Sequence, residues 1–137
     1  LYLQDQLENV QKRAARFITS NYTDYEPGSM TAILDQLQLP SLKDRRTQNR
    51  LILFCKNIHG QANLPSDQLK KPSRTTKNMH SQHFLRLQTK TDTLKYSFIP
   101  NTIKDWNLLP PDIFTKIQTA EEPAKTFSEI VRGAQLK

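Results

Sequence analysis

SLKDRRTQNRLILFCKNIHG, residues 41–60, is the segment that decides the fold, because helix signals stand at both of its ends. Ser41 and Asp44 resemble a capping box in which Asp replaces the usual Glu, and Gly60 supplies a stop. Between these ends, residues 51–55 would be apolar on every side of a helix. We therefore expect this helix to form the buried centre of the fold.

Two helices, of which the second is short, are expected before this segment. In residues 1–20, apolar side chains recur at steps of four and three and so share one face of a helix. They are Leu3, Leu7, Val10, Ala14 and Phe17. The chain opens on Leu1 with no capping residue before it, so we expect a helix cut from a longer one, with its first three residues exposed. A second helix is predicted after Ser29, its expected N-cap, and before Pro40.

The sequence changes character after the central helix. Residues 61–82 contain Pro65, Pro72 and many Ser, Thr, Lys and Asn residues, a composition typical of a loop or linker. In residues 85–98, apolar and polar side chains alternate with a period of two. That alternation predicts a two-stranded β-hairpin that turns near residues 90–92 and packs on the helices.

Two helices are predicted toward the carboxyl end. The first spans residues 100–110 and ends at the proline pair 110–111. Its inward-facing residues should be Ile103, Trp106 and Leu109. The last helix is signalled by Thr119 and Glu122 as a capping box, and Gly133 should mark its end.

The expected fold is mainly α with a small β-hairpin: about five short-to-medium helices around one modest core, with a basic loop. The chain has 137 residues, of which 36% are hydrophobic, so one modest core is what it can bury. Residues 1–60 should hold three helices, residues 61–82 a basic linker or loop, and residues 83–137 the hairpin and two or three helices. We expect these parts to form one structural unit.

Charge is concentrated in the middle of the chain. The protein has 20 Lys and Arg against 13 Asp and Glu, a formal net charge of +7. Residues 41–96 hold 12 of the basic side chains and three acids, whereas the remainder holds eight basic and ten acidic residues. A cationic middle between near-neutral ends favours binding to a polyanion, although a solvated surface has the same composition.

Ten basic side chains are therefore candidates for contact with the phosphates of RNA or DNA, without base reading. They are Arg45, Arg46, Arg50, Lys70, Lys71, Arg74, Lys77, Arg86, Lys90 and Lys95. Tyr96 lies within the same region, and stacking on a base remains an alternative for it. Trp106 lies at helical spacing from Ile103 and Leu109, which favours a core anchor over a stacking platform.

The sequence carries no recognisable catalytic or metal-binding pattern. Its three glycines are widely separated, so no phosphate-cradling loop is present, and His80 and His83 have no third ligand nearby. Cys55 lies in an apolar run and is expected to be a small buried hydrophobe rather than a nucleophile. We expect a non-enzymatic chain with no catalytic residues, metal or cofactor.

Cellular context follows from what the sequence can and cannot form. One cysteine allows no internal disulfide, which fits a reducing compartment. No apolar run approaches the ~20 residues that cross a bilayer, and no signal-peptide pattern is present. We therefore expect an intracellular protein of the cytoplasm and nucleus with no membrane partner.

Three stretches together resemble the region downstream of the polymerase in non-LTR retrotransposon reverse transcriptases of the jockey and LINE type. LENVQKRAARFI, residues 7–18, is similar to that family's helix with the pattern LE-x-VQ-(R/K)-RAARF. Residues 39–60 resemble its segment with paired arginines, a following RL and a terminal HG. YSFIPNTIKDWNLLP, residues 96–110, is similar to its SF-(F/I)-PRTI-x-(E/D)-WN-x-LP signature. The resemblance spans nearly the whole chain in order.

The resemblance implies a position within a larger polyprotein rather than an enzymatic activity. In that family the polyprotein carries an endonuclease, then the reverse transcriptase, then this tail, and the polymerase's paired-Asp metal motif has no counterpart here. The sequence departs from the signature at Asn101, where the family often has Arg, so one charge is lost. The implied partners are RNA or DNA and the parent reverse transcriptase domain.

Two functions remain open from the sequence. The chain could be a tail that grips the backbone of template RNA or target DNA, or a structural module that braces the polymerase thumb without touching nucleic acid. The two differ in whether the charges of residues 41–96 share one face, because a binding surface needs them together.

Overall fold

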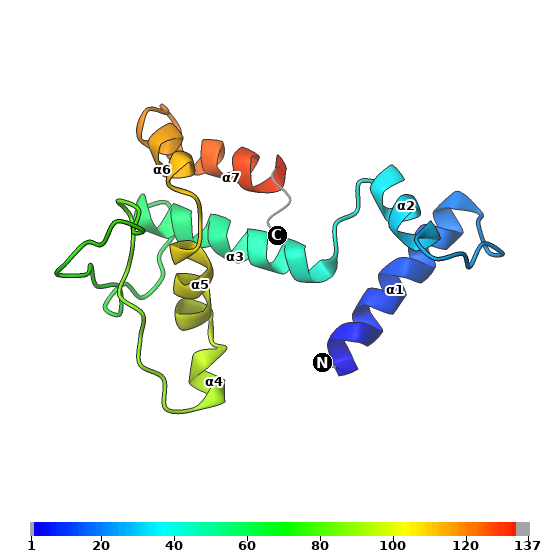
Figure 1. Cartoon of the computed structure of the whole chain (residues 1–137), viewed down its shortest axis with the longest axis horizontal. Coiled ribbons are helices and arrows are strands. Elements are labelled where there is room, and N and C mark those ends of the chain that lie inside the picture. Colours follow the sequence, from blue (N-terminus) through cyan, green and yellow to red (C-terminus); the bar gives the residue numbers. More distant parts are fainter. Residues whose placement is uncertain (1, 134–137) are drawn as a thin grey trace. The chain divides into compact units, whose positions relative to one another are not determined.

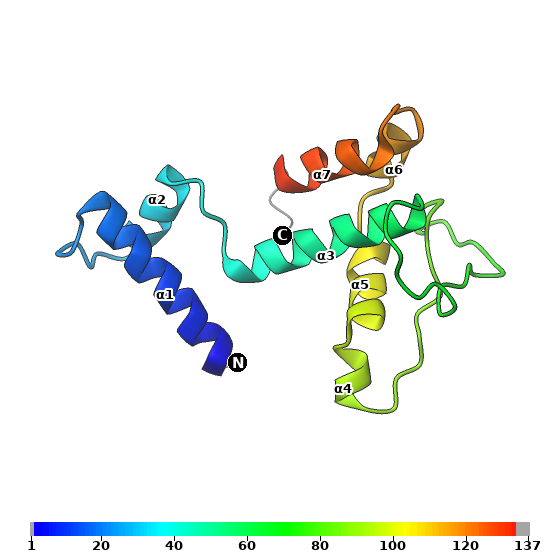
Figure 2. The same cartoon turned by 180° about the vertical axis from the view of Figure 1, so that it is seen from behind.

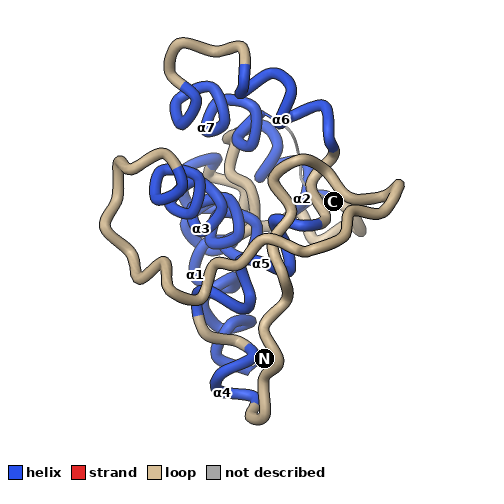
Figure 3. Tube along the Cα trace, turned by 90° about the vertical axis from the view of Figure 1, so that its left-hand side faces the viewer, coloured by secondary structure: helices blue, strands red, loops and turns tan. Residues whose placement is uncertain are grey.

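The computed structural model describes residues 2–133, which form seven α-helices and no strand (Figures 1 and 3). The chain divides into two compact units, Leu1–Arg46 (unit 1) and Thr47–Lys137 (unit 2), whereas the sequence suggested a single one. The mainly helical prediction is confirmed. The predicted β-hairpin is wrong, because its residues form an extended loop and a short helix in unit 2.

Unit 1 contains α1 (Tyr2–Thr19) and α2 (Ser29–Gln36). Its buried apolar side chains, among the described residues, are Ala15 from α1 and Ile33 from α2. The segment that leads into α3 is tied back to α1, because the Gln11 side chain donates to the Pro40 carbonyl at 3.0 Å. Unit 1 is therefore held by a small contact rather than by a sizeable core.

The apolar stripe predicted on α1 exists but is not buried. Its members, which we call the α1 stripe, are Leu3, Leu7, Val10, Ala14 and Phe17. All five are exposed; the four larger side chains keep 51% to 72% of their surface in solvent. Tyr2 and Leu3 are exposed as expected, whereas Leu1 lies outside the described residues.

The start of α2 lies one residue before the predicted position. Gly28, not Ser29, is the N-cap, and its φ of 90° is a left-handed conformation that glycine adopts without steric cost. Ser29 is instead the first helical residue, and its hydroxyl donates to the Asp24 carbonyl at 3.2 Å.

The central helix, α3 (Leu42–Ile58), has the predicted ends. The Asp44 N–H donates to the Ser41 hydroxyl at 3.1 Å, and that hydroxyl donates to the Asp44 carboxylate at 2.8 Å. At the other end, Gly60 has a φ of 72°, and the Gln61 N–H donates to the Lys56 carbonyl at 2.8 Å. This closure satisfies carbonyls that the helix end would leave free.

In unit 2, three helices pack around α3: α5 (Phe98–Asn107), α6 (Pro111–Gln118) and α7 (Pro123–Gly133). Figures 1 and 2 show α5 on one side of α3 and α6 with α7 on the other. Trp106 of α5 is 1% exposed, so the prediction of a core anchor is confirmed. Its ring lies 5.1 Å from those of Phe54 and Phe114 and 5.3 Å from that of Phe127.

Two or three helices were predicted in residues 83–137, but no bounds were predicted for α6, because its opening prolines were read only as a stop. Pro111 is its first residue, where the missing N–H leaves no hydrogen bond unmade. The predicted capping box at Thr119 and Glu122 is also wrong. The Thr119 hydroxyl donates back to the Lys116 carbonyl at 3.1 Å, at the end of α6, and α7 begins at Pro123.

The predicted hairpin region is an extended loop followed by a short helix, α4 (Asp92–Lys95). The Thr91 hydroxyl accepts from the Leu94 N–H at 3.3 Å and so caps α4 exactly where the hairpin was expected to turn. Of the alternating apolar residues, Leu94 and Tyr96 are exposed, so they supply no buried face for a strand.

A side chain takes the place of the missing partner strand. The Asn107 amide accepts from the Phe84 N–H at 3.0 Å and donates to the Phe84 carbonyl at 2.8 Å. The Leu85 N–H donates to the Lys70 carbonyl at 2.8 Å. These bonds satisfy the extended backbone without a β-ladder, which explains why period-two alternation was misleading here.

The 33 residues between α3 and α4 contain neither helix nor strand, yet buried side chains fasten them to the core. Phe84 is buried against Phe54 at 5.6 Å between ring centres. His80 was expected to be an ordinary loop residue, but it is 5% exposed and stacks on Phe114 at 4.1 Å. Phe84 and His80 therefore attach the long loop to the core of unit 2.

The partners of His80 define its protonation state. Its Nδ1 accepts from the Gln82 N–H at 3.2 Å, so Nε2 carries the proton that is donated to the Trp106 carbonyl at 3.0 Å. Burial lowers the pKa of His80; the bond to Trp106 opposes this, and the charges of His83 and Lys71 add to it. A proton on Nδ1 would face the Gln82 N–H, so the folded state favours neutral His80.

We expect Trp106→Ala to lower the free energy of unfolding by about 3–5 kcal/mol, because it empties the centre of the aromatic cluster. Leu108→Ala, two residues away at a side chain that is 76% exposed, is the matched control and should change stability by less than about 0.5 kcal/mol. Urea unfolding measures both. Equal effects from the two changes would contradict the assignment of Trp106 as the anchor.

We expect the chain to lose stability as the pH falls below about 6.5, the ordinary pKa of His in an unfolded chain. Because the folded pKa of His80 is lowered, the unfolded state binds the proton first, and the loss continues down to the folded pKa. The slope is at most about 1.4 kcal/mol per pH unit for each proton. Thermal unfolding between neutral and acidic pH should show a shallower slope in His80→Gln than in the exposed-site control His59→Gln. An unchanged slope in His80→Gln would assign the acid sensitivity elsewhere.

Candidate nucleic-acid interface

Unit 2 contains a hollow whose charged lining residues are all basic. It has a volume of about 70 Å³, and we call it the cationic hollow. It is lined by Arg86, Leu87, Thr89, Lys95, Tyr96, Pro100, Asn101 and Lys104. Three positive charges thus converge with hydroxyl and amide groups around a space suited to a small anion such as a phosphate.

Three consecutive elements build the hollow. The loop before α4 supplies Arg86, α4 supplies Lys95, and α5 supplies Lys104. Asn101 and Lys104 lie three residues apart on α5, a spacing that places them on the same helix face. The Lys95 ammonium lies 5.2 Å from the centre of the Tyr96 ring, so the exposed tyrosine lies beside a cation.

The hollow lies on a well-anchored part of the unit. Leu87 packs against the core, and the Asn107 amide holds Phe84 two residues before Arg86. The other wall is α5, which the buried Ile103 and Trp106 fix to the core. The backbone that carries Arg86 and Lys104 is therefore fixed before binding, which costs less conformational entropy than ordering the same charges on a free loop.

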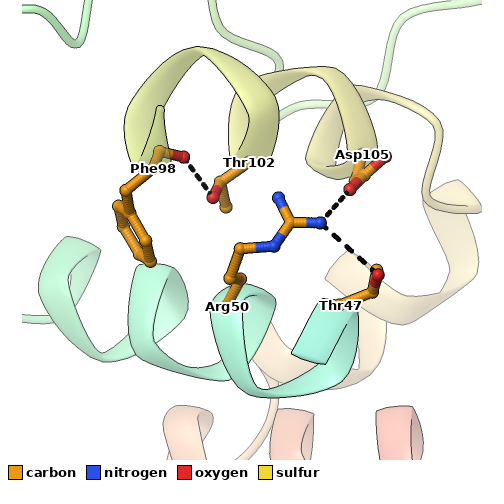
Figure 4. Close-up of polar contacts among 5 residues, drawn as sticks. All are labelled: Thr47, Arg50, Phe98, Thr102 and Asp105. Atoms are coloured by element: carbon orange, nitrogen blue, oxygen red, sulfur yellow. Dashed lines mark hydrogen bonds and ion pairs between the residues drawn. The ribbon is translucent and has the colours of Figure 1, made fainter. Parts of the chain in front are cut away.

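Arg50, one of the ten predicted contacts, has a different partner. Figure 4 shows its guanidinium reaching from α3 to α5, where it donates to the Asp105 carboxylate at 2.8 Å. A longer contact of 3.4 Å joins it to the Thr47 hydroxyl on its own helix. Its side chain is only 22% exposed, so Arg50 joins two helices and is not free for a phosphate.

The remaining predicted cations do not join the cationic hollow. Arg45 and Arg46 are exposed on the first turns of α3, in unit 1. The Lys71 ammonium lies 4.4 Å above the Phe84 ring and donates to the Gln82 side chain, and burial lowers its pKa. The other loop cations are exposed and outside the lining. They are Lys70, Arg74, Lys77 and Lys90.

Lys104 was missing from the predicted set because it lies outside the basic region that charge counting defined. The spacing Asn101–Lys104 within a predicted helix was the available signal, although only the structure shows what faces it. Asn101, at the position where the resembled family often has Arg, lines the hollow next to these charges. It contributes a neutral amide there rather than a fourth cation.

Two other hollows differ in chemistry. The larger, about 480 Å³, lies between α3 and α7, where Lys56, Lys125 and Arg132 alternate with Glu122 and Glu129. Its mixed charges give a polyanion little net attraction. The other is mainly apolar and is lined partly by Trp106.

Metal and membrane criteria give no further site in the described part of the chain. No group of three or more His, Cys, Asp or Glu residues within residues 2–133 is placed to hold a metal ion. Cys55 is buried, and burial raises the pKa of its thiol to about 12, which disfavours the reactive thiolate. None of the described helices has the length and apolar character that crossing a membrane requires.

Comparisons with protein-family models, curated proteins and solved structures found no match to this chain. The resemblance to the retrotransposon tail therefore stays a prediction from the sequence. The geometry of unit 2 carries the functional argument.

We expect Arg50→Met to lower the free energy of unfolding by about 1–2 kcal/mol, because it keeps the apolar stem but leaves Asp105 without its charged partner. Lys104→Met, on the exposed side of α5, should change stability by less than about 0.5 kcal/mol. Chemical unfolding of both variants measures the difference. If Arg50→Met leaves the free energy of unfolding unchanged, the ion pair between Arg50 and Asp105 does not stabilise the packing of α3 on α5.

Proposed function

We propose that this chain is a non-catalytic module that binds the sugar-phosphate backbone of RNA or DNA through the cationic hollow. The convergence of Arg86, Lys95 and Lys104 without an acidic neighbour in the lining carries this proposal. The resemblance to the tail of non-LTR retrotransposon reverse transcriptases supplies the context: the module would hold template RNA or target DNA near the parent polymerase.

The geometry favours backbone contact over base reading. Guanidinium and ammonium groups bind phosphate oxygens. Helix α4 has four residues and is too short to lie along a groove and contact base edges. The exposed loop cations, including Lys70, Arg74 and Lys77, extend the positive charge of the same unit and would steer a strand toward the hollow. Tyr96 is 64% exposed at the edge, where a base could stack.

We expect the triple variant Arg86→Gln, Lys95→Gln, Lys104→Gln to bind a short single-stranded RNA, and its DNA counterpart, much more weakly than the wild type. Each lost phosphate contact should lower the slope of log affinity against log salt by about 0.7. Fluorescence anisotropy across a salt series measures affinity and slope together, and wild-type binding should not depend on base sequence.

The matched control removes the same charge elsewhere in unit 2. Lys56→Gln, Lys116→Gln, Arg132→Gln also replaces three exposed cations, so it separates a local site from an effect of net charge. It should retain the wild-type salt slope. Equal losses in the two triple variants, or a wild-type affinity independent of salt, would refute a backbone-binding hollow.

Reversing the loop charges tests how far the interface extends. Lys70→Glu, Arg74→Glu and Lys77→Glu together should reduce binding by at least tenfold, because repulsion replaces attraction along the approach to the hollow. The three residues are exposed in a loop, so circular dichroism and melting temperature should stay close to the wild type. Unchanged affinity would confine the interface to the hollow.

A second candidate function is a structural brace against the polymerase thumb, which the exposed α1 stripe favours. Isolated apolar side chains are common on surfaces, but a stripe along one helix face is typical of a surface that packs against a partner. In this interpretation unit 1 docks on the polymerase while unit 2 carries the charge, so the two functions belong to different units.

We expect Leu7→Gln and Val10→Gln to leave the stability of this chain within about 0.5 kcal/mol of the wild type, since both side chains are exposed here. In a longer chain that includes an upstream polymerase, the same changes should lower the melting temperature if the stripe packs on the thumb. Ala14→Gln, on the same stripe, should act like them, and Lys12→Gln, on the opposite face, should act like the wild type. No effect of any of these changes in the longer chain would exclude the brace.

A further inference from the structure

The mainly apolar hollow of unit 2 shares no lining residue with the cationic hollow. We call it the apolar pocket. It is lined by Ile58, His59, Gln82, Trp106, Phe114, Ile117, Gln118 and Pro123. It lies where the end of α3, the end of α6 and the start of α7 meet the C-terminal end of α5. No Lys, Arg, Asp or Glu lines it, so its lining suits a neutral group better than an ion.

The pocket is large enough for a ring. Its volume is about 210 Å³. An engineered apolar cavity of about 150 Å³ in another protein stays dry and binds benzene. The present pocket therefore has room for a single aromatic ring or a compact two-ring system. Its inner walls are Trp106, Phe114 and Ile117, which the core holds in place.

The polar groups lie on the solvent side of the pocket. Gln118 and His59 are exposed, and Gln82 is half-buried. The Gln118 amide makes only a long contact of 3.5 Å, to the Ser81 hydroxyl, which a small movement would break. An amide presents a donor and an acceptor side by side, the arrangement that pairs with the edge of a nucleobase.

Unpaired bases are recognised by such a combination. A base in a protein pocket lies against aromatic and apolar side chains, and side-chain amides bond to its edge. The pocket and the cationic hollow both take a residue from α5, but Lys104 and Trp106 are two residues apart and so point to different sides of that helix.

We infer that the apolar pocket receives one unpaired nucleobase of a bound single strand, with Gln118 bonding to its edge. The inference rests on the proposed function, since the cationic hollow would bring the strand to unit 2. It goes beyond that function, because a strand held in this way would be bound only where it is unpaired.

The single tryptophan provides a direct readout. Trp106 lines the pocket, and its indole N–H donates to the Gln82 carbonyl at 2.8 Å, so the indole signal in a nitrogen–proton correlation spectrum is unique and local. Nucleosides carry no phosphate, so titration with adenosine, guanosine, cytidine and uridine tests the pocket without the cationic hollow. At least one should shift the indole signal to saturation.

Three variants locate the binding. Gln118→Leu removes the amide and should weaken nucleoside binding by about three- to tenfold, the factor that one hydrogen bond of ordinary strength carries. Gln88→Leu makes the same change at an exposed residue outside the pocket and should bind like the wild type. Ile58→Phe fills the pocket from its half-buried rim and should abolish the shift, provided its circular dichroism matches the wild type.

Each result decides the matter. If no nucleoside shifts the indole signal, or if Gln118→Leu binds like Gln88→Leu, the base pocket is refuted. If indole or toluene shifts the signal and nucleosides do not, the pocket takes an apolar group of another kind, and the inference is also refuted. The triple variant at Arg86, Lys95 and Lys104 should bind nucleosides like the wild type. Failure of nucleoside binding with intact, salt-dependent RNA binding would overturn the base pocket alone and leave the proposed function standing.

Discussion

The indole of Trp106 is the contact on which unit 2 depends. Its ring meets Phe54 of α3, Phe114 of α6 and Phe127 of α7, and its N–H donates to the Gln82 carbonyl in the long loop. One side chain therefore connects three helices and a segment with no regular structure. Aromatic pairs in such arrangements add stability beyond the burial of their surface, which matters in a chain with so modest an apolar share.

The position of the charges follows from that anchor. Because Trp106 fixes α5, the helix holds Lys104 on the side away from the core. Asn107, the residue after Trp106, bonds to the backbone of Phe84, two residues before Arg86. The cations of the hollow come from separate elements. The loop that carries Arg86 and helix α5 are fastened to the same cluster, whereas α4, which carries Lys95, has no buried residue. Arg50, which looks free in the sequence, is instead used to hold α3 to α5 through Asp105. Charge count alone does not distinguish these two uses.

Local signals predicted local structure well. The caps of α3, with Gly60 at its end, and the burial of Trp106 were evident from neighbours within a few residues. The hairpin failed because the bonds that satisfy Phe84 come from Asn107, 23 residues away, and no local pattern shows them. The cationic hollow was predicted only in part, since Lys104 lies outside the basic region and its approach to Arg86 depends on tertiary packing.

Chemical-shift mapping with a short single-stranded RNA is the most direct test of our proposal that the cationic hollow binds phosphates. Backbone amides should shift most at residues 86–89 and 95–104, on both walls of the hollow. The amide signals of the mixed-charge hollow between α3 and α7, which contains Lys56 and Arg132, should change little, although that hollow also contains cations. Shifts concentrated at the mixed-charge hollow, or none above background at a salt concentration where binding is observed, would contradict the account.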